Sequence, residues 1–346
     1  MSTVTTTDVD PYQPGSGTPL LQVRDLSVDF RTEDGHVCAV DQVTLEARAG
    51  ELLAVVGESG CGKSVMAMAL SGLLPRNATV TGSVELAGHQ LVGASASDLR
   101  RVRGSRIAYI FQEPMTSLNP VFTIGRQVAE VLRVHEGMDR RQALDRAAEL
   151  LDLVGIANPR ERLRQYPHQL SGGLRQRVMI AMAVAGNPEV LVADEPTTAL
   201  DVTVQAGILD VLRDLRDRLG AAVVLITHDL GVVADIADRV LVMYAGRVVE
   251  RGDVHELFAR PRHHYTMGLL GAVPTPRIDE QEERLREIPG LVPTLERPED
   301  RCTFADRCPA ADDTCRTHQP PLERAPESNH EVACWHPAGT EGKETR

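Results

Sequence analysis

The sequence predicts an α/β protein built around a mostly parallel β-sheet, with a small antiparallel β layer at one edge. Four short runs of branched apolar residues are typical of strands that are buried on both faces. Amphipathic helical patterns separate these runs, and strands that alternate with helices of this kind form parallel sheets. The four runs are Leu52–Val56, Val190–Ala193, Ala222–Ile226 and Val240–Met243.

The first segment, residues 1–19, is polar, and we expect it to be a disordered leader. It has neither the basic start nor the apolar stretch of a secretory signal. No run of about 18 apolar residues, the length that a membrane-spanning helix needs, occurs in the sequence. The half-buried segments Leu20–Phe30 and Val43–Arg48 precede the first apolar run and suit the antiparallel layer.

The stretch from about residue 115 to residue 186 contains several helical patterns and no convincing buried strand. We therefore expect it to be an inserted helical subdomain. After Thr275 the apolar periodicity fades, while proline, charged residues and four cysteines dominate. This change predicts one domain over residues 20–274 and a C-terminal extension over residues 275–346.

The charge balance excludes a general affinity for nucleic acid. The 346 residues include 49 acidic and 37 basic side chains, which gives a formal net charge of -12. Such a chain has no overall attraction for phosphate backbones or anionic lipid, and its aromatic content of 3% argues against base stacking. Only two basic residues are lysines, Lys63 and Lys343, so a lysine at a chemical position is informative.

The strongest chemical motif is GESGCGKS at residues 57–64, which fits G-x-x-x-x-G-K-[ST]. It follows the predicted strand Leu52–Val56 and precedes a helical stretch, which is the context in which such a loop binds phosphates. Lys63 can reach the β- and γ-phosphates, and the Ser64 hydroxyl is placed to ligate Mg²⁺. The motif predicts a P-loop NTPase core, RecA-like in type, that binds the phosphates of a nucleotide. The predicted nucleotide-binding residues here are Gly57, Ser59, Gly60, Cys61, Gly62, Lys63, Ser64 and Val65.

Two carboxylates at the end of a later strand complete the predicted catalytic site. The segment VLVADE covers residues 190–195, so Asp194 and Glu195 come where a buried strand ends. Asp194 suits the Mg²⁺ shell, and Glu195 suits a general base that polarises the attacking water. The alternative is an acidic helix cap after a strand, which the nearby P-loop makes less attractive.

A set of four motifs in order resembles the ABC-type ATPases over roughly residues 20 to 260. The set consists of the P-loop, LSGG at residues 170–173, the Asp194-Glu195 pair, and Thr-His-Asp at residues 227–229. The resemblance implies that two ATPases meet head to tail, with each P-loop facing the partner's LSGG across a shared ATP. Ser171 and Gly173 would then bind the γ-phosphate of the partner's nucleotide.

The same resemblance implies roles for four further residues. Gln112 matches the Q-loop residue, which contacts Mg²⁺ or the attacking water and moves with the membrane partner. Asp201 matches the D-loop, and His228 matches the switch histidine that contacts the γ-phosphate. Phe30 stands where the family places an aromatic ring against adenine; the alternative is an ordinary core residue.

Three longer strings resemble one branch of this family, the D-type ATPase subunit of bacterial dipeptide and oligopeptide permeases. They are QEPMTSLNPVFTIG at 112–125, LSGGLRQRVMIAMA at 170–183 and DEPTTALDVTVQ at 194–205. The tail HHYTMGLL at 263–270 extends the likeness. Two departures are Leu174, where many members have glutamine, and His264, where members usually have proline.

This branch implies an ATP hydrolase that energises the import of di- or oligopeptides as a peripheral subunit on the cytoplasmic face of the membrane. The implied partners are a second, F-type ATPase subunit in a head-to-tail heterodimer, two membrane permease subunits and an extracytoplasmic solute-binding protein. Importers of nickel and of other solutes share the branch. A different class is a soluble ABC ATPase of DNA repair or translation, which usually carries a coiled-coil insertion or two fused cassettes; this chain has one P-loop and no long heptad run.

The C-terminal extension carries four cysteines in the pattern C-x5-C-x6-C-x18-C, namely Cys302, Cys308, Cys315 and Cys334. The pattern resembles the extension of peptide-importer ATPases, which has been associated with an iron–sulfur cluster. Four thiolates can hold [4Fe–4S] or tetrahedral Zn²⁺. Structural zinc usually occupies closer C-x₂₋₄-C pairs, which favours the cluster over zinc or free thiols. A third function, an iron–sulfur redox enzyme, would need a substrate pocket that the sequence does not indicate.

Overall fold

The computed structural model describes residues 18–33, 35–112, 117–198, 201–273, 288–325 and 328–339. Most of the predicted leader therefore lies outside the described residues, as do the expected boundaries at residue 115 and at Thr275. Within the described ranges, no helix is long and apolar enough to cross a membrane. The division into residues 1–19, 20–274 and 275–346, with a helical subdomain over 115–186, stays a prediction.

The strands form two sheets, as the sequence predicts. One is antiparallel, in the order β2-β1-β4-β5, and the other has eight strands in the order β11-β12-β10-β9-β3-β8-β7-β6. The strands are β1 (Leu21–Thr32), β2 (Gly35–Ala47), β3 (Leu52–Val56), β4 (Ala78–Leu86), β5 (His89–Gln90), β6 (Ile107–Ile110), β7 (Val190–Asp194), β8 (Ala222–Ile226), β9 (Arg239–Tyr244), β10 (Arg247–Asp253), β11 (Glu323–Arg324) and β12 (Glu331–Val332).

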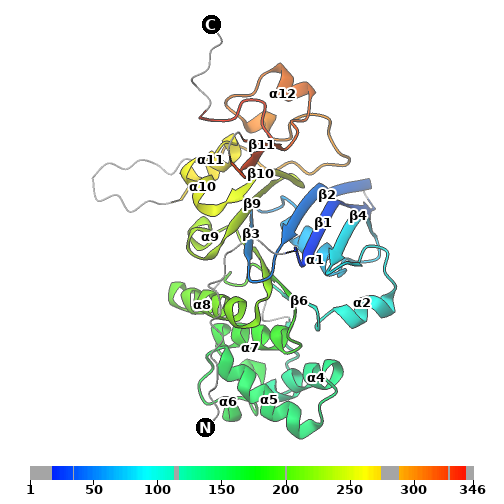
Figure 1. Ribbon diagram of the computed structural model, residues 1–346, viewed down its shortest axis with the longest axis vertical. Coiled ribbons are helices and arrows are strands. Elements are labelled where there is room, and N and C mark those ends of the chain that lie inside the picture. The colour runs from blue at the N-terminus through cyan, green and yellow to red at the C-terminus, as the bar shows by residue number, and fades with distance from the viewer. Residues whose placement is uncertain are drawn as a thin grey trace, which may run out of the picture.

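The helices connect and cover these strands. The α-helices are α1 (Lys63–Leu70), α2 (Ala96–Val102), α4 (Ile124–His135), α5 (Arg140–Leu153), α6 (Pro159–Arg162), α7 (Gly172–Val184), α8 (Val202–Leu219), α9 (Leu230–Ile236), α10 (Val254–Ala259), α11 (His264–Gly271) and α12 (Asp313–Thr317). Two short 3₁₀ turns are η1 (Pro167–Gln169) and η2 (Ala305–Arg307). Helices α4 to α6 lie at one end of the long axis and α12 at the other (Figure 1).

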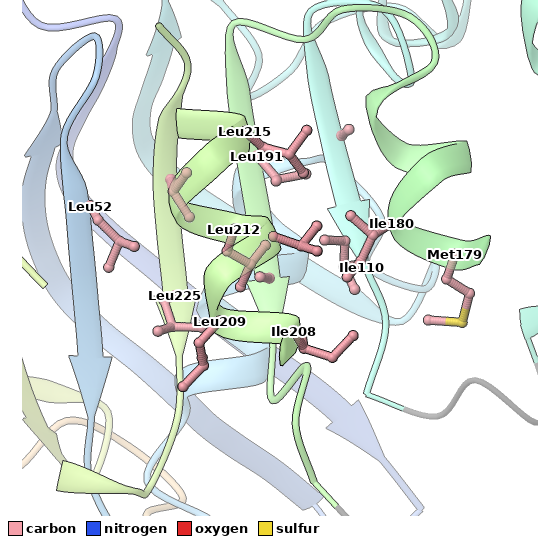
Figure 2. Packing of buried hydrophobic residues seen from close by; sticks show 14 of the residues in the cluster. Leu52, Ile110, Met179, Ile180, Leu191, Ile208, Leu209, Leu212, Leu215 and Leu225 are labelled. Atoms are coloured by element: carbon pink, nitrogen blue, oxygen red, sulfur yellow. The ribbon is translucent and has the colours of Figure 1, made fainter. Parts of the chain in front are cut away.

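The central strands are parallel and buried on both faces because their side chains alternate between two cores. Strand β3 pairs in parallel with β8 and β9, and β7 pairs in parallel with β6 and β8. Leu52 and Leu225 face one core together with Leu212 of α8, and Figure 2 shows α8 packed across these strands. Leu53 and Val55 face the other core, which the antiparallel sheet and α1 share.

The C-terminal residues extend the central sheet at its edge. Strand β12 pairs with β10, β11 pairs with β12, and Leu295 makes an isolated bridge with Cys38 of β2. Phe304 is 2% exposed and belongs to the same hydrophobic core as the central strands. The segment therefore gains its stability from the core of the central sheet as well as from its own contacts.

Candidate active site

The loop between β3 and α1 requires glycine at two positions. Gly57 has φ +153°, and a Cβ there would lie 2.3 Å from the carbonyl oxygen of Met243. Gly62 has φ +98°, caps the start of α1, and a Cβ there would lie 2.3 Å from the carbonyl oxygen of Ala39. Any larger side chain would displace the loop from β2 and β9, so these glycines set its path.

Lys63 is the first residue of α1 and is only 5% exposed. Its Nζ donates hydrogen bonds to the carbonyl oxygens of Gly57, at 2.7 Å, and Glu58, at 2.8 Å. The loop thus wraps around its own ammonium group. This geometry holds a compact positive charge at the start of a helix, where the backbone N–H groups also attract phosphate.

Asp194 ends β7 and connects the loop to a second strand. Its Oδ1 accepts a hydrogen bond from the Ser64 hydroxyl at 3.0 Å, and its Oδ2 accepts one from the Tyr109 hydroxyl at 2.6 Å. Burial raises the pKa of Asp194, and the hydrogen bonds from Tyr109 and Ser64 partly oppose that rise. Ser64 and Asp194 together present oxygen ligands of the type that Mg²⁺ prefers, so the residues fit this ion.

Glu195 lies at the centre of a polar network. Its Oε2 accepts hydrogen bonds from Gln112 Nε2 and from the Thr198 hydroxyl, both at 2.8 Å, and its Oε1 lies 3.2 Å from Nδ1 of His228. Burial alone would raise the pKa of Glu195, but the hydrogen bonds from Thr198 and His228 and the charges of His228 and Lys63 lower it overall. The three residues predicted to be catalytic, Gln112, Glu195 and His228, therefore meet at one carboxylate.

The LSGG segment and the predicted D-loop lie together at the starts of α7 and α8. Ser171 caps α7 by accepting a hydrogen bond from the Leu174 N–H, and Asp201 caps α8 by accepting one from the Val204 N–H. A Cβ on Gly173 would lie 2.4 Å from Cγ1 of Val204, so glycine allows the two helix starts to approach. In the described part of the chain, no hydrogen bond joins Ser171 or Gly173 to the loop around Lys63.

The remaining predicted nucleotide-binding residues occupy the loop and its surroundings. Ser59 and Gly60 are exposed at the loop's tip, and Val65 is half-buried in α1. Cys61 is 1% exposed, and burial raises the pKa of its thiol. Phe30 is partly buried and packs against the core beneath the antiparallel sheet, so its adenine contact stays a prediction.

The four C-terminal cysteines lie in one neighbourhood. Cys302 and Cys308 flank the turn η2, Cys315 lies in α12, and Cys334 follows β12. Burial raises the pKa of every one of these thiols, and it raises the pKa of Cys334 to about 12. The backbone N–H of Cys302 donates a 3.0 Å hydrogen bond to the carbonyl oxygen of Cys315, and the charges of Cys302, Cys308 and Cys315 contribute to the raised pKa of Cys334.

A second arrangement involves only one of these cysteines. Asp312, Cys315 and His336 form the only group of three metal-ligating side chains, among the residues described, whose ligand atoms lie within 4.8 Å of one another. His336 Nε2 lies 3.0 Å from Asp312 Oδ2, and Asp312 also caps α12. The four thiols do not form such a group.

Sequence reasoning missed two residues that hold the carboxylates predicted to form the catalytic site. Tyr109 reaches Asp194 from β6, and Thr198 reaches Glu195 from the segment after β7. Thr198 could have been found, because a hydroxyl three residues after a carboxylate often bonds back to it in a turn. Tyr109 could not, because its contact depends on the pairing of β6 with β7.

The fold and the site define the class of the protein. Residues 40–198 match the ABC transporter family. Two solved cassettes are similar, both at 28% identity. One is a dimeric ATP-binding cassette in a post-hydrolysis state bound to ADP and Pi (TM-score 0.62, covering 68% of this chain and 98% of that one). The other is cbiO1 from Clostridium perfringens (TM-score 0.60, 70% and 91%). The chain is an ATP hydrolase of the ABC type.

A second match identifies the branch. Residues 249–315 match the family described as the oligopeptide/dipeptide transporter, C-terminal region. A protein of Sinorhizobium fredii named "Probable peptide ABC transporter ATP-binding protein" is 53% identical over 91% of this chain and 94% of its own length. The oligopeptide transport ATP-binding protein of Mycobacterium bovis is also 53% identical, over 91% of this chain and 52% of its own length. The chain belongs to the ATP-binding proteins of ABC transporters, in the branch that carries this C-terminal region.

Proposed function

We propose that the chain hydrolyses ATP to energise the import of di- and oligopeptides, as a peripheral subunit on the cytoplasmic face of the membrane. The match of residues 249–315 to a peptide-transporter region and the names of the similar proteins support this cargo. The observation that carries the catalytic part is the convergence of Gln112, Thr198 and His228 on Glu195, beside the P-loop.

In the proposed reaction, Glu195 is the general base. Its lowered pKa keeps the carboxylate ionised at neutral pH, so it can accept a proton from the attacking water. The water oxygen forms a bond to the γ-phosphorus as the bond to the β-γ bridging oxygen breaks, and ADP leaves. Gln112 and His228 orient the carboxylate and the water. Ser64 and Asp194 would hold Mg²⁺, which would neutralise phosphate charge when bound.

The test of this role is Glu195→Gln in the assembled transporter. We expect ATP binding to persist, turnover to fall by at least about a hundredfold, and a closed ATPase dimer to accumulate. Glu149→Gln is the matched control, because Glu149 is exposed on α5 and pairs with Arg146. An ATPase rate that Glu195→Gln leaves unchanged would remove Glu195 from this role.

We further infer that a second ATPase of the same transporter, the F-type subunit, completes each nucleotide site. The support is the start of α7, where Ser171 and Gly172 are exposed and Gly173 is buried against Val204, and where no hydrogen bond joins this described segment to the chain's own loop around Lys63. Ser171→Arg should therefore impair the partner's nucleotide site. With one site labelled in the heterodimer, loss of binding at this chain's own P-loop would contradict the arrangement.

We propose that Cys302, Cys308, Cys315 and Cys334 hold a [4Fe–4S] cluster that stabilises the C-terminal segment, with Zn²⁺ as the alternative. Tetrahedral zinc, with Zn–S bonds of about 2.3 Å, would draw the sulfurs to within about 4 Å of one another. The larger cluster suits four thiols that lie in one neighbourhood without forming a group within 4.8 Å.

Elemental analysis of protein purified without oxygen tests this assignment. We expect about four iron atoms for each chain, lost in Cys308→Ser and retained in Cys38→Ser, because Cys38 lies on β2 outside the pattern. Near-zero iron with one zinc for each chain would contradict the assignment of an iron–sulfur cluster.

Co-purification and transport assays test the partners and the cargo. We expect recovery with two membrane permeases and a second ATPase, delivery of solute by an extracytoplasmic binding protein, and uptake of radiolabelled dipeptides. Uptake of nickel in place of dipeptides would identify the other cargo of this branch. Recovery with nucleic acid or ribosomes would contradict a transport role.

A further inference from the structure

Glu58, the second residue of the P-loop motif, makes hydrogen bonds through its backbone N–H, its carbonyl oxygen and its carboxylate. Its backbone N–H donates a 2.7 Å hydrogen bond to the Tyr265 hydroxyl. Its carboxylate accepts two hydrogen bonds from Arg307, at 2.7 Å from Nη1 and 3.0 Å from Nη2. Its carbonyl oxygen accepts a hydrogen bond from the Lys63 ammonium group. Arg307 and Tyr265 both lie within or next to the C-terminal region, far along the chain from the loop that they contact.

The orientation of Arg307 is fixed by all five of its N–H donors. Besides the two bonds to Glu58, Nε donates to the carbonyl oxygen of Pro289 at 2.8 Å and Nη2 to that of Ile288 at 3.1 Å. Nη1 also donates to the Tyr244 hydroxyl at 3.4 Å. The side chain is only 6% exposed. A saturated, buried guanidinium of this kind holds a carboxylate in one place, unlike a surface ion pair that solvent loosens.

Tyr265, the other distant residue that contacts Glu58, is packed in a buried aromatic cluster. Tyr265 and Tyr244 are fully buried, and their ring centroids lie 4.8 Å apart. Phe304 lies against both rings, with centroids 5.2 Å from Tyr244 and 5.4 Å from Tyr265. Phe304 and Arg307 belong to the same short stretch between Cys302 and Cys308. The aromatic cluster therefore ties Tyr265 and Arg307 into one packed unit.

The position of Glu58 matters for phosphate binding because its carbonyl is one of the two backbone acceptors that orient Lys63. A displacement of Glu58 moves the ammonium that must reach the phosphates. Arg307 also neutralises the Glu58 carboxylate, which would otherwise repel the phosphates of ATP from within the loop itself. Both effects act first on nucleotide binding, and among the residues described neither Arg307 nor Tyr265 is hydrogen-bonded to the proton-accepting group, Glu195.

We propose that Arg307 and Tyr265 are positioning residues of the ATP site, so that the C-terminal segment clamps Glu58 and thereby sets the affinity of the P-loop for ATP. The proposal rests on the proposed function, in which this P-loop binds ATP for hydrolysis. Because Arg307 directly precedes Cys308, a disturbance at that cysteine reaches the phosphate-binding loop through one neighbouring residue. By thermodynamic reciprocity, bound ATP also stabilises the C-terminal segment.

The test compares the affinity for ATP and the kinetics of four variants of the full-length chain. Arg307→Gln removes the bidentate pair, and Tyr265→Phe leaves the Glu58 N–H without its acceptor. Each should raise the Kd for ATP, and the KM of the assembled transporter, about tenfold, with kcat within about twofold of wild type. Glu58→Ala and the double variant Glu58→Ala with Arg307→Gln complete a double-mutant cycle.

The cycle separates positioning from a general loosening of the fold. If Arg307 acts through Glu58, Arg307→Gln changes the Kd less than twofold when Glu58 is already alanine. If Arg307→Gln weakened ATP binding equally in the wild type and in Glu58→Ala, the proposal would be overturned. Arg301→Gln is the matched control, because Arg301 lies in the same segment but pairs with Glu299 and Asp306.

Further measurements distinguish a loss of the contacts to Glu58 from unfolding of the C-terminal segment. The thermal midpoint and the iron content of each variant reveal whether the C-terminal segment still folds. If Arg307→Gln unfolds this segment, Tyr265→Phe alone tests whether the contacts to Glu58 set the affinity for ATP. A Kd for ATP that Tyr265→Phe leaves within twofold of wild type would overturn the clamp. Hydrolysis by wild type and by Arg301→Gln establishes the proposed function independently, so its failure is distinguishable from failure of the clamp.

Discussion

Tyr109→Phe removes one hydroxyl group from the edge of the candidate active site where we propose that Mg²⁺ binds. In the wild type this hydroxyl donates a 2.6 Å hydrogen bond to Oδ2 of Asp194, a residue that is 5% exposed. Phenylalanine keeps the ring and its packing, so the substitution isolates the hydrogen bond. It leaves one carboxylate oxygen buried without the donor that stabilises its negative charge.

The size and the sign of the effect follow from the burial of Asp194. A hydrogen bond to a charged group contributes about 1.5–3 kcal/mol, and 1.36 kcal/mol corresponds to one pKa unit. Burial already raises the pKa of Asp194, while the Tyr109 hydrogen bond lowers it. Losing that bond raises the pKa further. Because the ionised form binds Mg²⁺, the acid limb of the ATPase pH profile should move to higher pH.

The assay is the ATPase rate of the assembled transporter from about pH 5 to 9, measured at several Mg²⁺ concentrations. We expect the Mg²⁺ concentration for half-maximal activity to rise about tenfold at pH 6.5 and less at pH 8.5. Tyr166→Phe is the control, because Tyr166 is 39% exposed and stacks on His168, away from the carboxylates. A profile for Tyr109→Phe that superimposes on wild type at every Mg²⁺ concentration would refute the reasoning.

Three further substitutions probe the base, the loop and the core. Thr198→Val removes a 2.8 Å hydrogen bond that lowers the pKa of Glu195, so the acid limb of kcat should move to higher pH; an unmoved limb would contradict this role. Gly62→Ala forces an L side chain to φ +98° against the carbonyl of Ala39; we expect ATP binding in a filter assay to disappear and the free energy of unfolding to fall by about 1–3 kcal/mol. Leu212→Ala empties a fully buried site on α8 and should lower the free energy of unfolding in urea by about 2–5 kcal/mol, with the Kd for ATP unchanged.

The parts of the fold that are local in sequence could be predicted. The run Leu52–Val56 and the helix on which Leu212 lies carry their own hydrophobic periodicity, because each buries its side chains in a regular way. The P-loop is contiguous, so Lys63 and its glycines could be identified without knowledge of the fold. Glu195 and His228 follow buried strands, and parallel strands bring their carboxyl ends to one edge of a sheet.

The sequence by itself determined the chemistry of this protein: one phosphate-binding loop, one pair of carboxylates, and the order of the motifs. Only the tertiary structure decided which residues hold those groups in place. Tyr109 reaches Asp194 across a strand pair, and Arg307 reaches Glu58 across 249 positions of the chain. Such contacts carry no local signal, because they depend on strand register and side-chain packing. The physical reason is that a motif specifies which atoms react, whereas their positions result from the packing of the entire sheet and its C-terminal edge.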